Sequence, residues 1–178
     1  MFTMKVDEDI ELGLVDRTFA KHYIKATREN YEHLMKWMGW PLYCRTEQEF
    51  YNFINGYLHE YAAGRSVNCG IFYKDEMVGG IGFHFIDYTL GKLQIGYWLI
   101  KSAQGNGIVT RACKRMIEYA FNDLNMKKVE IRVAPENNRS CAVCERLGMR
   151  LEGVITCSEN LNGKVVDHMV YGLARQAV

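Results

Sequence analysis

Gln94-Ile-Gly-Tyr-Trp-Leu-Ile100 is an apolar run that predicts a strand, and Lys101-Ser-Ala-Gln-Gly-Asn-Gly-Ile-Val-Thr110 follows it as a loop with two glycines. Beyond the loop, apolar side chains recur at helical spacing: Val109, Cys113, Met116, Ile117, Ala120, Phe121 and Leu124. Glycines let a loop present its backbone N–H groups closely, and a helix N-terminus adds unpaired amides and the positive end of its dipole. This order of elements predicts a binding site for a phosphorylated ligand.

A pair of glycines before a helix is also what a plain tight turn requires, so the phosphate site begins as one of two interpretations. Other phosphate loops fit the sequence badly. No Gly-Lys-Ser or Gly-Lys-Thr is present for a nucleoside triphosphatase, and Gly105-Asn-Gly107 lacks the third glycine of a dinucleotide fingerprint. These two classes of nucleotide-binding protein are therefore excluded.

The 178 residues are enough for one domain with a hydrophobic core, and no linker, repeat or low-complexity segment divides them. We therefore expect a single domain over residues 1–178. A net charge of +1 disfavours nucleic acid as a direct partner. The first residues lack the apolar core of a signal peptide, and no apolar run reaches the roughly 20 residues of a membrane span. We expect a soluble, cytoplasmic protein with no membrane partner.

Six cysteines are scattered among the predicted strands and helices: Cys44, Cys69, Cys113, Cys141, Cys144 and Cys157. Without a secretory signal, reduced thiols at apolar positions are a better interpretation than disulfides. Cys141-x-x-Cys144 has no second cysteine pair and no neighbouring pair of histidines, and it falls inside a predicted helix. We therefore interpret it as helix packing and expect no metal site.

The other periodicities predict the remaining elements. Before the glycine loop we expect a strand at 10–14, a helix over 16–38 that breaks near 28–30, a helix over 46–61, and strands at 67–73, 77–87 and 92–100. Thr46-Glu-Gln-Glu49 is a capping box, and the aromatic stripe after it predicts a buried helix face. After the loop we expect a helix over 109–124, a strand at 128–133, a helix over 139–147, and strands at 149–161 and 164–173. Asn162-Gly163 predicts the turn between the last two strands.

The strands before the glycine loop have short connections, which predict an antiparallel meander. Strand 92–100, helix 109–124 and strand 128–133 form a strand–helix–strand unit. Its right-handed crossover would make the two strands parallel neighbours. The predicted fold class is therefore α/β, with a mixed sheet flanked by helices.

Two segments carry a resemblance to a known family. Gln104-Gly-Asn-Gly107-Ile-Val resembles the coenzyme A signature Gln/Arg-x-x-Gly-x-Gly/Ala of the GCN5-related N-acetyltransferases, abbreviated GNAT. Pro135-Glu-Asn-Asn-Arg-Ser140 resembles the second block of that family. Val109 departs from the pattern, because glycine or alanine is usual there. The resemblance implies the GNAT fold, a mostly antiparallel mixed sheet whose central parallel strands splay apart.

The C-terminal part narrows the resemblance to one branch. Leu151-Glu-Gly153 and Glu159-Asn-Leu-Asn162 look like the Rim-type ribosomal-protein acetyltransferases, and most like those that acetylate an N-terminal serine. The branch implies acetyl transfer from acetyl-coenzyme A to a primary amine, by direct attack in a ternary complex. The N-terminal amine of a ribosomal protein is the favoured acceptor. A small amine, such as an antibiotic, polyamine or amino acid, is the alternative acceptor. A coenzyme-A-binding protein without turnover is the alternative class.

The resemblance also implies where acetyl-coenzyme A binds as the acetyl donor. The pantetheine would pair with the backbone of strand 92–100, and the pyrophosphate would rest on the glycine loop. Carried over residue by residue, the cofactor-binding set is Leu99, Ile100, Gln104, Gly105, Asn106, Gly107, Val109, Thr110, Asn137 and Ser140. The candidates for the nucleotide phosphate are Lys101, Arg111, Lys114 and Arg139, although such residues are more often solvated surface charges.

Ser140 and Glu159 are the candidates for catalysis. By resemblance, Ser140 would donate to the departing thiolate, and the alternative is a polar residue in the first turn of a helix. Asn137 is equally well explained as the cap of that helix. An α-amino group has a pKa of about 7.7–8.0, so a modest base is enough. Similar proteins place a glutamate at Glu159, where the alternative is a solvated strand-end carboxylate.

Two further expectations concern rival bases and assembly. His84 and His168 each stand alone in a strand pattern, for which a structural role is commoner. The acceptor groove would be built from loops near 28–46 and 155–165. The resemblance predicts a homodimer, and so does the aromatic-rich region 31–61, which carries more apolar surface than a small domain must bury.

Overall fold

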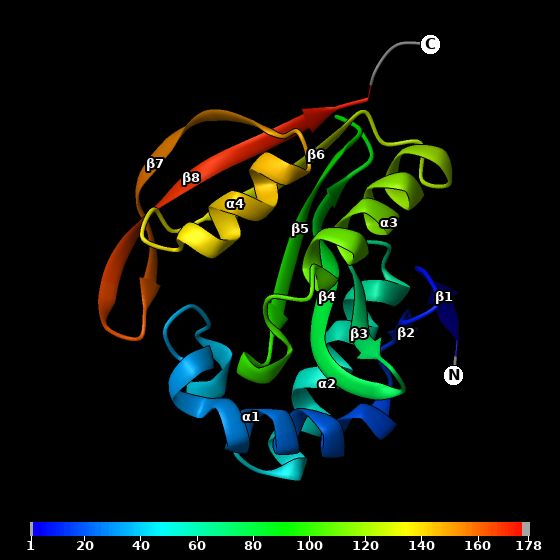
Figure 1. The fold of residues 1–178 in the computed structure, drawn as a ribbon, viewed down its shortest axis with the longest axis vertical. Coiled ribbons are helices and arrows are strands. Elements are labelled where there is room, and N and C mark those ends of the chain that lie inside the picture. Colours follow the sequence, from blue (N-terminus) through cyan, green and yellow to red (C-terminus); the bar gives the residue numbers. More distant parts are fainter. Residues whose placement is uncertain (1, 176–178) are drawn as a thin grey trace.

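The structure is a computed structural model that describes residues 2–175. One eight-stranded sheet runs through it in the order β1-β2-β3-β4-β5-β6-β8-β7 (Figure 1). Its strands are β1 (Thr3–Lys5), β2 (Ile10–Leu14), β3 (Val67–Tyr73), β4 (Glu76–Asp87), β5 (Lys92–Leu99), β6 (Lys128–Val133), β7 (Arg150–Leu161) and β8 (Lys164–Ala174). The α-helices are α1 (Ala20–Leu34), α2 (Glu47–Ala62), α3 (Ile108–Asn122) and α4 (Asn138–Arg146). The 3₁₀ turns are η1 (Arg17–Phe19), η2 (Trp40–Leu42) and η3 (Lys101–Ala103).

The first predicted helix is shorter than its periodicity indicated. The α-helix ends at Leu34, and the segment expected to continue to residue 38 leaves the helix there. The predicted break is confirmed, because Asn30 has non-helical angles (φ −128°) inside α1. The capping box is also confirmed: Thr46 accepts from the Glu49 amide, and the Glu49 carboxylate accepts from the Thr46 amide. Strand β1 was not predicted, because three residues are too few to show a period of two.

The predicted parallel pair is β5 and β6, joined through α3. Their register covers only Lys92–Gln94 against Lys128–Glu130. Beyond that point β5 continues against β4 as far as Leu99, and β6 continues against β8. Figure 1 shows β5 and β6 diverging. The splayed parallel strands of the GNAT fold are therefore confirmed, and the opening between them begins after Gln94.

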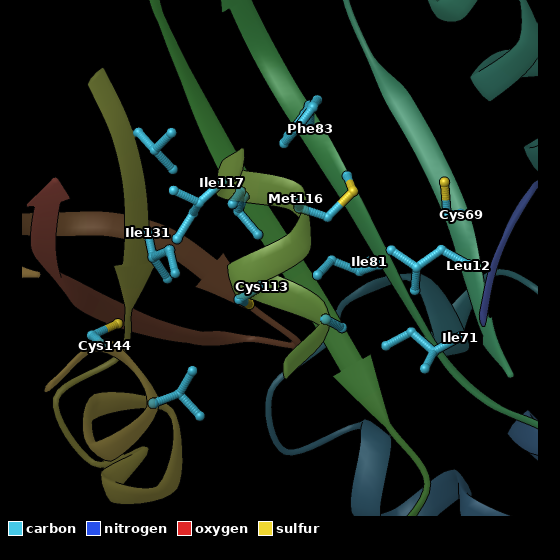
Figure 2. Close-up of a cluster of buried hydrophobic side chains, with 14 of the residues drawn as sticks. Leu12, Cys69, Ile71, Ile81, Phe83, Cys113, Met116, Ile117, Ile131 and Cys144 are labelled. Atoms are coloured by element: carbon cyan, nitrogen blue, oxygen red, sulfur yellow. The ribbon is translucent and has the colours of Figure 1, made fainter. Parts of the chain in front are cut away.

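Two pairs of helices cover the two faces of the sheet. Successive strand residues point to opposite faces, and on β3 Ile71 joins the larger core cluster while Phe72 packs on the cluster of α1 and α2. Figure 2 shows Cys113, Met116 and Ile117 of α3 directed at the strands of the larger cluster. Residues of α4 belong to the same cluster. Thus α3 and α4 lie on one face, and α1 and α2 lie on the other.

The aromatic stripe of α2 is mostly internal. Phe50 and Ile54 are fully buried. Rings from α1, η2, α2 and β5 pack in edge-to-face and tilted contacts in one cluster formed by Tyr23, Trp40, Phe50, Phe53, Tyr57 and Trp98. The predicted excess of apolar surface over 31–61 is therefore wrong for most of these residues. Tyr43 and Tyr61 are the large aromatics of this region that remain exposed among the described residues.

Five of the six cysteines are buried in the fold. Cys44, Cys69, Cys113, Cys141 and Cys144 are buried free thiols, as the apolar positions predicted. Cys157 is the exception, since it is exposed on β7 and has a φ of +50°. Across residues 2–175, no helix has the length and apolar character needed to cross a membrane.

Candidate active site

The glycine loop owes its shape to two positive φ angles. Gly105 has φ +87° and Gly107 has φ +67°, and a Cβ added at either would meet nothing within 4 Å. Backbone conformation, rather than lack of space, is therefore what requires glycine. Helix α3 starts at Ile108, and no side chain of the described residues caps it. The amides of its first turn thus face the loop, as the phosphate-site interpretation expected.

Polar side chains support the loop from both sides. Asn106 donates through Nδ2 to the Ala103 carbonyl (3.1 Å). Arg111 donates to Asp7 Oδ2 (2.7 Å) and to the Asn106 carbonyl (3.2 Å). Burial raises the pKa of Asp7, but hydrogen bonds from the Asp9 amide and from Arg111 outweigh it and leave the pKa lowered. Of the four candidate cations, Arg111 is therefore held in an ion pair and Arg139 donates to Gln104, which leaves the exposed Lys101 and Lys114 better placed to reach a ligand.

At the end of β5, Leu99 directs its backbone into the opening, as the hydrogen bonds of the next residue show. The Ile100 amide donates to the Val78 carbonyl of β4 (2.8 Å), and the Ile100 carbonyl accepts from the Ala103 amide (3.3 Å). Backbone groups of an antiparallel strand alternate in direction, so the N–H and C=O of Leu99 point away from β4, toward the opening. The expectation of a ligand contact at Leu99 keeps geometric support. For Ile100, only the resemblance supports it.

A residue that the sequence analysis missed holds this end of β5. His33 lies on α1 beyond the kink, with Nε2 3.1 Å from the Leu99 carbonyl oxygen and 3.1 Å from Gln104 Nε2. Gln104 also accepts from Arg139 through Oε1, and Asn30 at the kink accepts from the Lys101 amide (3.0 Å). Helix α1 therefore contacts both β5 and the glycine loop.

Ser140 lies in the first turn of α4 and has an unexpected partner. The hydroxyls of Ser140 and Tyr97 are 2.6 Å apart, so the contact joins α4 to β5. Burial raises the pKa of Tyr97 well above its usual range, which keeps the phenol protonated. Asn137 caps α4, because its Oδ1 accepts from the Ser140 amide (3.3 Å). The capping interpretation of Asn137 is therefore confirmed.

Glu159 lies on β7 near the hairpin turn, and it is not isolated. Its Oε2 is 3.2 Å from His168 Nε2, and His168 Nδ1 is 3.0 Å from Ser158 Oγ. The view of His168 as a lone histidine was therefore wrong. His84, the other rival base, lies on β4 opposite Gln94, and burial lowers its pKa.

The two candidate catalytic side chains, Ser140 and Glu159, lie on opposite faces of the sheet. On β8, Met169 and Tyr171 belong to the cluster that α4 covers. His168 alternates with them and so faces the other side. Glu159 pairs with Val166, which shares the face of His168. Ser140 thus lies on the α4 side and Glu159 on the α1 side.

The two segments expected to form the acceptor groove meet at the β7–β8 hairpin. Asn162 at its turn donates through Nδ2 to the carbonyls of Met35 (2.9 Å) and Met38 (3.1 Å). Figure 1 shows the chain after α1 beside the tip of this hairpin. The loop after α1 and the hairpin therefore form one wall near Glu159.

These features fit acetyl-coenzyme A. The opened ladder leaves the outward backbone of Leu99 for an extended arm, and the glycine loop with the uncapped α3 suits a pyrophosphate. In the described residues no cluster of histidine, cysteine, aspartate or glutamate has the arrangement of a metal site.

Comparisons with known proteins agree with this geometry. The family described as "Acetyltransferase (GNAT) domain" matches residues 16–150. YdaF of Bacillus subtilis, a protein assigned to the ribosomal N-acetyltransferases, is 33% identical over 179 residues, covering 99% of this chain and 97% of YdaF. The ribosomal-protein-serine acetyltransferase of Escherichia coli is 29% identical over 169 residues, covering 95% of this chain and 94% of that enzyme.

Solved structures give the same result. The ribosomal L7/L12 alpha-N-protein acetyltransferase RimL in complex with coenzyme A has a TM-score of 0.93 at 25% identity, with 97% of this chain and 98% of that chain covered. The Microcin C7 self immunity acetyltransferase MccE, in complex with acetyl-CoA and AMP, has a TM-score of 0.92 at 29% identity, with 97% and 96% covered. The chain thus belongs to the GNAT family and is an N-acetyltransferase whose acetyl donor is acetyl-coenzyme A.

Proposed function

We propose that the acceptor is the N-terminal amine of a ribosomal protein. For acetyl transfer to an amine, the supporting observation is the arrangement of Ser140 and Glu159 on opposite faces of the sheet, beside the opening after Gln94. The cofactor and the amine can then enter from different sides and meet in one complex. The similarity to enzymes named for ribosomal proteins supports this acceptor.

In the proposed reaction the acceptor ammonium loses two protons. Acetyl-coenzyme A supplies a thioester, whose carbonyl carbon is the electrophile. Glu159 takes the first proton from the acceptor ammonium, which frees the amine lone pair for direct attack. The Leu99 N–H, which points into the opening, stabilises the developing oxyanion. Ser140 donates a hydrogen bond at the sulfur as the C–S bond breaks, and the protonated Tyr97 phenol supports Ser140. The leaving thiolate takes up the second proton that the nitrogen loses, and departs as the free thiol.

The proposed cofactor-binding residues follow from the same layout. Leu99 and Ile100 would flank the pantetheine, with Asn137 and Ser140 opposite them on α4. The pyrophosphate cradle would consist of Gln104, Gly105, Asn106, Gly107, Val109 and Thr110. Val109 is accommodated because it stands in the first turn of α3 and packs, half-buried, on the larger core cluster.

A small-molecule amine is the second candidate acceptor. MccE, which is named for immunity to a microcin, resembles this chain as closely in fold as the ribosomal enzyme does. The geometry of Ser140 and Glu159 serves either acceptor, because both need a deprotonated amine in front of the same thioester. A non-catalytic coenzyme A protein is no longer favoured, given the family to which the chain belongs.

A panel of acceptors tests the proposal through release of the free thiol. It should contain ribosomal protein L7/L12 with a free N-terminus, a peptide of its first residues, spermidine and free amino acids. We expect release with the protein and the peptide. A matched peptide with an acetylated N-terminus should give none, because it has no free α-amine. Turnover with small amines alone would replace the ribosomal acceptor by the second candidate.

We also propose a homodimer that works in the cytoplasm, where a ribosomal acceptor would be found. The aromatic region 31–61 no longer supports the dimer. The edge strand β7 does, because Leu151, Val154 and Ile155 are exposed on a strand that pairs only with β8 among the described residues. Such edges are sites of association. Light scattering should give twice the mass of the chain at micromolar concentration, and a monomer there would reject the dimer.

A further inference from the structure

His168 is held from both ring nitrogens by consecutive residues of β7. Ser158 Oγ lies at Nδ1 (3.0 Å), and Glu159 Oε2 lies at Nε2 (3.2 Å). The His168 side chain is 17% exposed, whereas that of Glu159 is 42% exposed. The imidazole is therefore fixed within the hairpin, and the carboxylate it contacts faces solvent.

This contact depends on an irregularity of β7. In a regular strand, consecutive side chains point to opposite faces, so Ser158 and Glu159 would not both reach one imidazole. Ile155 pairs with His168 and Glu159 pairs with Val166, so residues 156–158 lie opposite the single residue Asp167. The strand bulges there, and bulges re-aim side chains.

A specific hydrogen bond stabilises the bulge. Cys157 adopts a φ of +50°, which is uncommon for a residue other than glycine. The Asp167 carboxylate compensates by accepting from the Cys157 amide (2.9 Å). Asp167 and His168 are neighbours on β8, so one strand both supports the bulge and contacts its two re-aimed side chains. Such local strain is commonly concentrated at functional sites.

The direction of the hydrogen bonds follows from the groups involved. An ionised carboxylate only accepts, so His168 Nε2 must carry the proton and donate to Glu159. In the neutral imidazole, Nδ1 then has the lone pair and accepts from the Ser158 hydroxyl. The Glu159 carboxylate thus fixes the tautomer, and the Ser158 hydroxyl, which can donate or accept, holds the second ring nitrogen.

We propose that His168 is a positioning residue for acetyl transfer. It holds the Glu159 carboxylate through Oε2 and leaves Oε1 as the oxygen that takes the proton of the acceptor ammonium. This inference rests on the proposed role of Glu159 as base. The bulge at 156–158 is the structural device that brings the two residues together, with Ser158 as the partner that holds Nδ1 of the ring.

Steady-state kinetics of three variants tests the proposal. His168→Val removes the donor and suits a strand, whereas His168→Gln keeps a donor on a side chain of similar length. We expect His168→Val to lower kcat for the acceptor about 10- to 100-fold, the usual effect of losing a hydrogen bond to a charged group. The KM for acetyl-coenzyme A should not change. His168→Gln should recover part of the rate, and Ser158→Ala should lower it less than His168→Val does.

The decisive measurement is a double-mutant cycle with Glu159→Gln. If His168 acts through Glu159, adding His168→Val to Glu159→Gln should lower kcat less than twofold further, because the group being positioned is already lost. A merely structural histidine would lower kcat equally in both backgrounds, which would overturn the proposal. Ala174→Ser, at an exposed position of the same strand outside the segments expected to form the acceptor groove, is the control for substitution in β8 and should leave kcat unchanged.

The outcomes separate this inference from the proposed function. Wild-type kcat in His168→Val, with Glu159→Gln impaired, would overturn the positioning role alone. Wild-type kcat in Glu159→Gln would remove the base itself, and the inference with it. Thermal unfolding of each variant checks folding. If His168→Val fails to fold, the same cycle is run with Ser158→Ala, for which equal losses in both backgrounds again overturn the proposal.

Discussion

The hydroxyl groups of Tyr97 and Ser140 lie 2.6 Å apart, and this contact connects β5 to α4 at the opening of the sheet. Tyr97 is the stronger donor of the two, because a phenol is more acidic than an aliphatic alcohol. Burial keeps it protonated. Donation from Tyr97 to Ser140 would leave the serine proton available for the leaving thiolate. The pair also gives the Tyr97 phenol a hydrogen-bond partner inside the fold.

Ser140→Ala should therefore lower kcat and leave the affinity for coenzyme A nearly intact, because its proposed contact matters as the thiolate leaves. Tyr97→Phe should have a smaller effect in the same direction, about 3- to 10-fold, which is the worth of one hydrogen bond. In the Ser140→Ala background Tyr97→Phe should add little. Equal losses of binding and rate in Ser140→Ala would show that the serine is only part of the helix cap.

The glycine loop gives a prediction with a matched control. Gly107 and Gly64 have similar positive φ values, +67° and +72°, so an added Cβ strains both by roughly 1–2 kcal/mol. Acetyl-coenzyme A should raise the melting temperature of the wild type, because it binds the folded state. Gly64→Val should lower the melting temperature but keep this rise, whereas Gly107→Val should lose it. A full ligand-induced rise in Gly107→Val would contradict the proposed cradle.

Most of the fold was predictable because its signals are local. The strands at 10–14, 67–73 and 128–133 have the predicted bounds, since each is a compact run between turn residues. The hairpin turn was equally readable. Asn162 (φ +54°) and Gly163 (φ +92°) both adopt the positive φ angles for which the Asn-Gly pair is suited.

The site was only partly predictable, because its contacts join residues that are distant in the sequence. Tyr97 and Ser140 are 43 residues apart, and His33 and Leu99 are 66 apart. No periodicity reports such pairs. The bulge of β7 was hidden for a different reason. The apolar pattern of a strand does not show where residues are inserted, so no partner of His168 could be predicted.

Stability should fall in acid because of the capping box of α2. Hydrogen bonds from the Arg45 and Thr46 amides lower the pKa of Glu49 below its ordinary value of 4.5. A carboxyl group whose pKa is lowered by folding stabilises the protein above its unfolded pKa, and this contribution is lost as the pH falls through the folded value. The difference in urea midpoint between wild type and Glu49→Gln should therefore be constant near neutral pH and shrink below pH 4.5.

Thr46→Ala provides the comparison for Glu49. It removes the hydroxyl that accepts from the Glu49 amide, so it should cost about 1 kcal/mol at neutral pH. Thr46→Ala should still lose stability in acid as the wild type does, because the Glu49 carboxylate can still accept from the backbone amides. A Glu49→Gln difference that stays constant down to pH 3 would show that the carboxylate contributes no charge-dependent stability.

The contact between His33 and β5 predicts an effect on cofactor affinity from a helix outside the glycine loop. One neutral imidazole nitrogen cannot donate to the Leu99 carbonyl and accept from the Gln104 amide at once, yet Nε2 lies 3.1 Å from both. With either tautomer, His33 restrains either the Leu99 carbonyl or the Gln104 side chain.

His33→Leu releases both groups and should weaken acetyl-coenzyme A binding about 3- to 10-fold, the loss expected for one hydrogen bond. Calorimetry measures this directly. His22→Leu, at an exposed position of the same helix, is the control and should bind like the wild type. Unchanged affinity in His33→Leu would show that the end of β5 holds its conformation without α1.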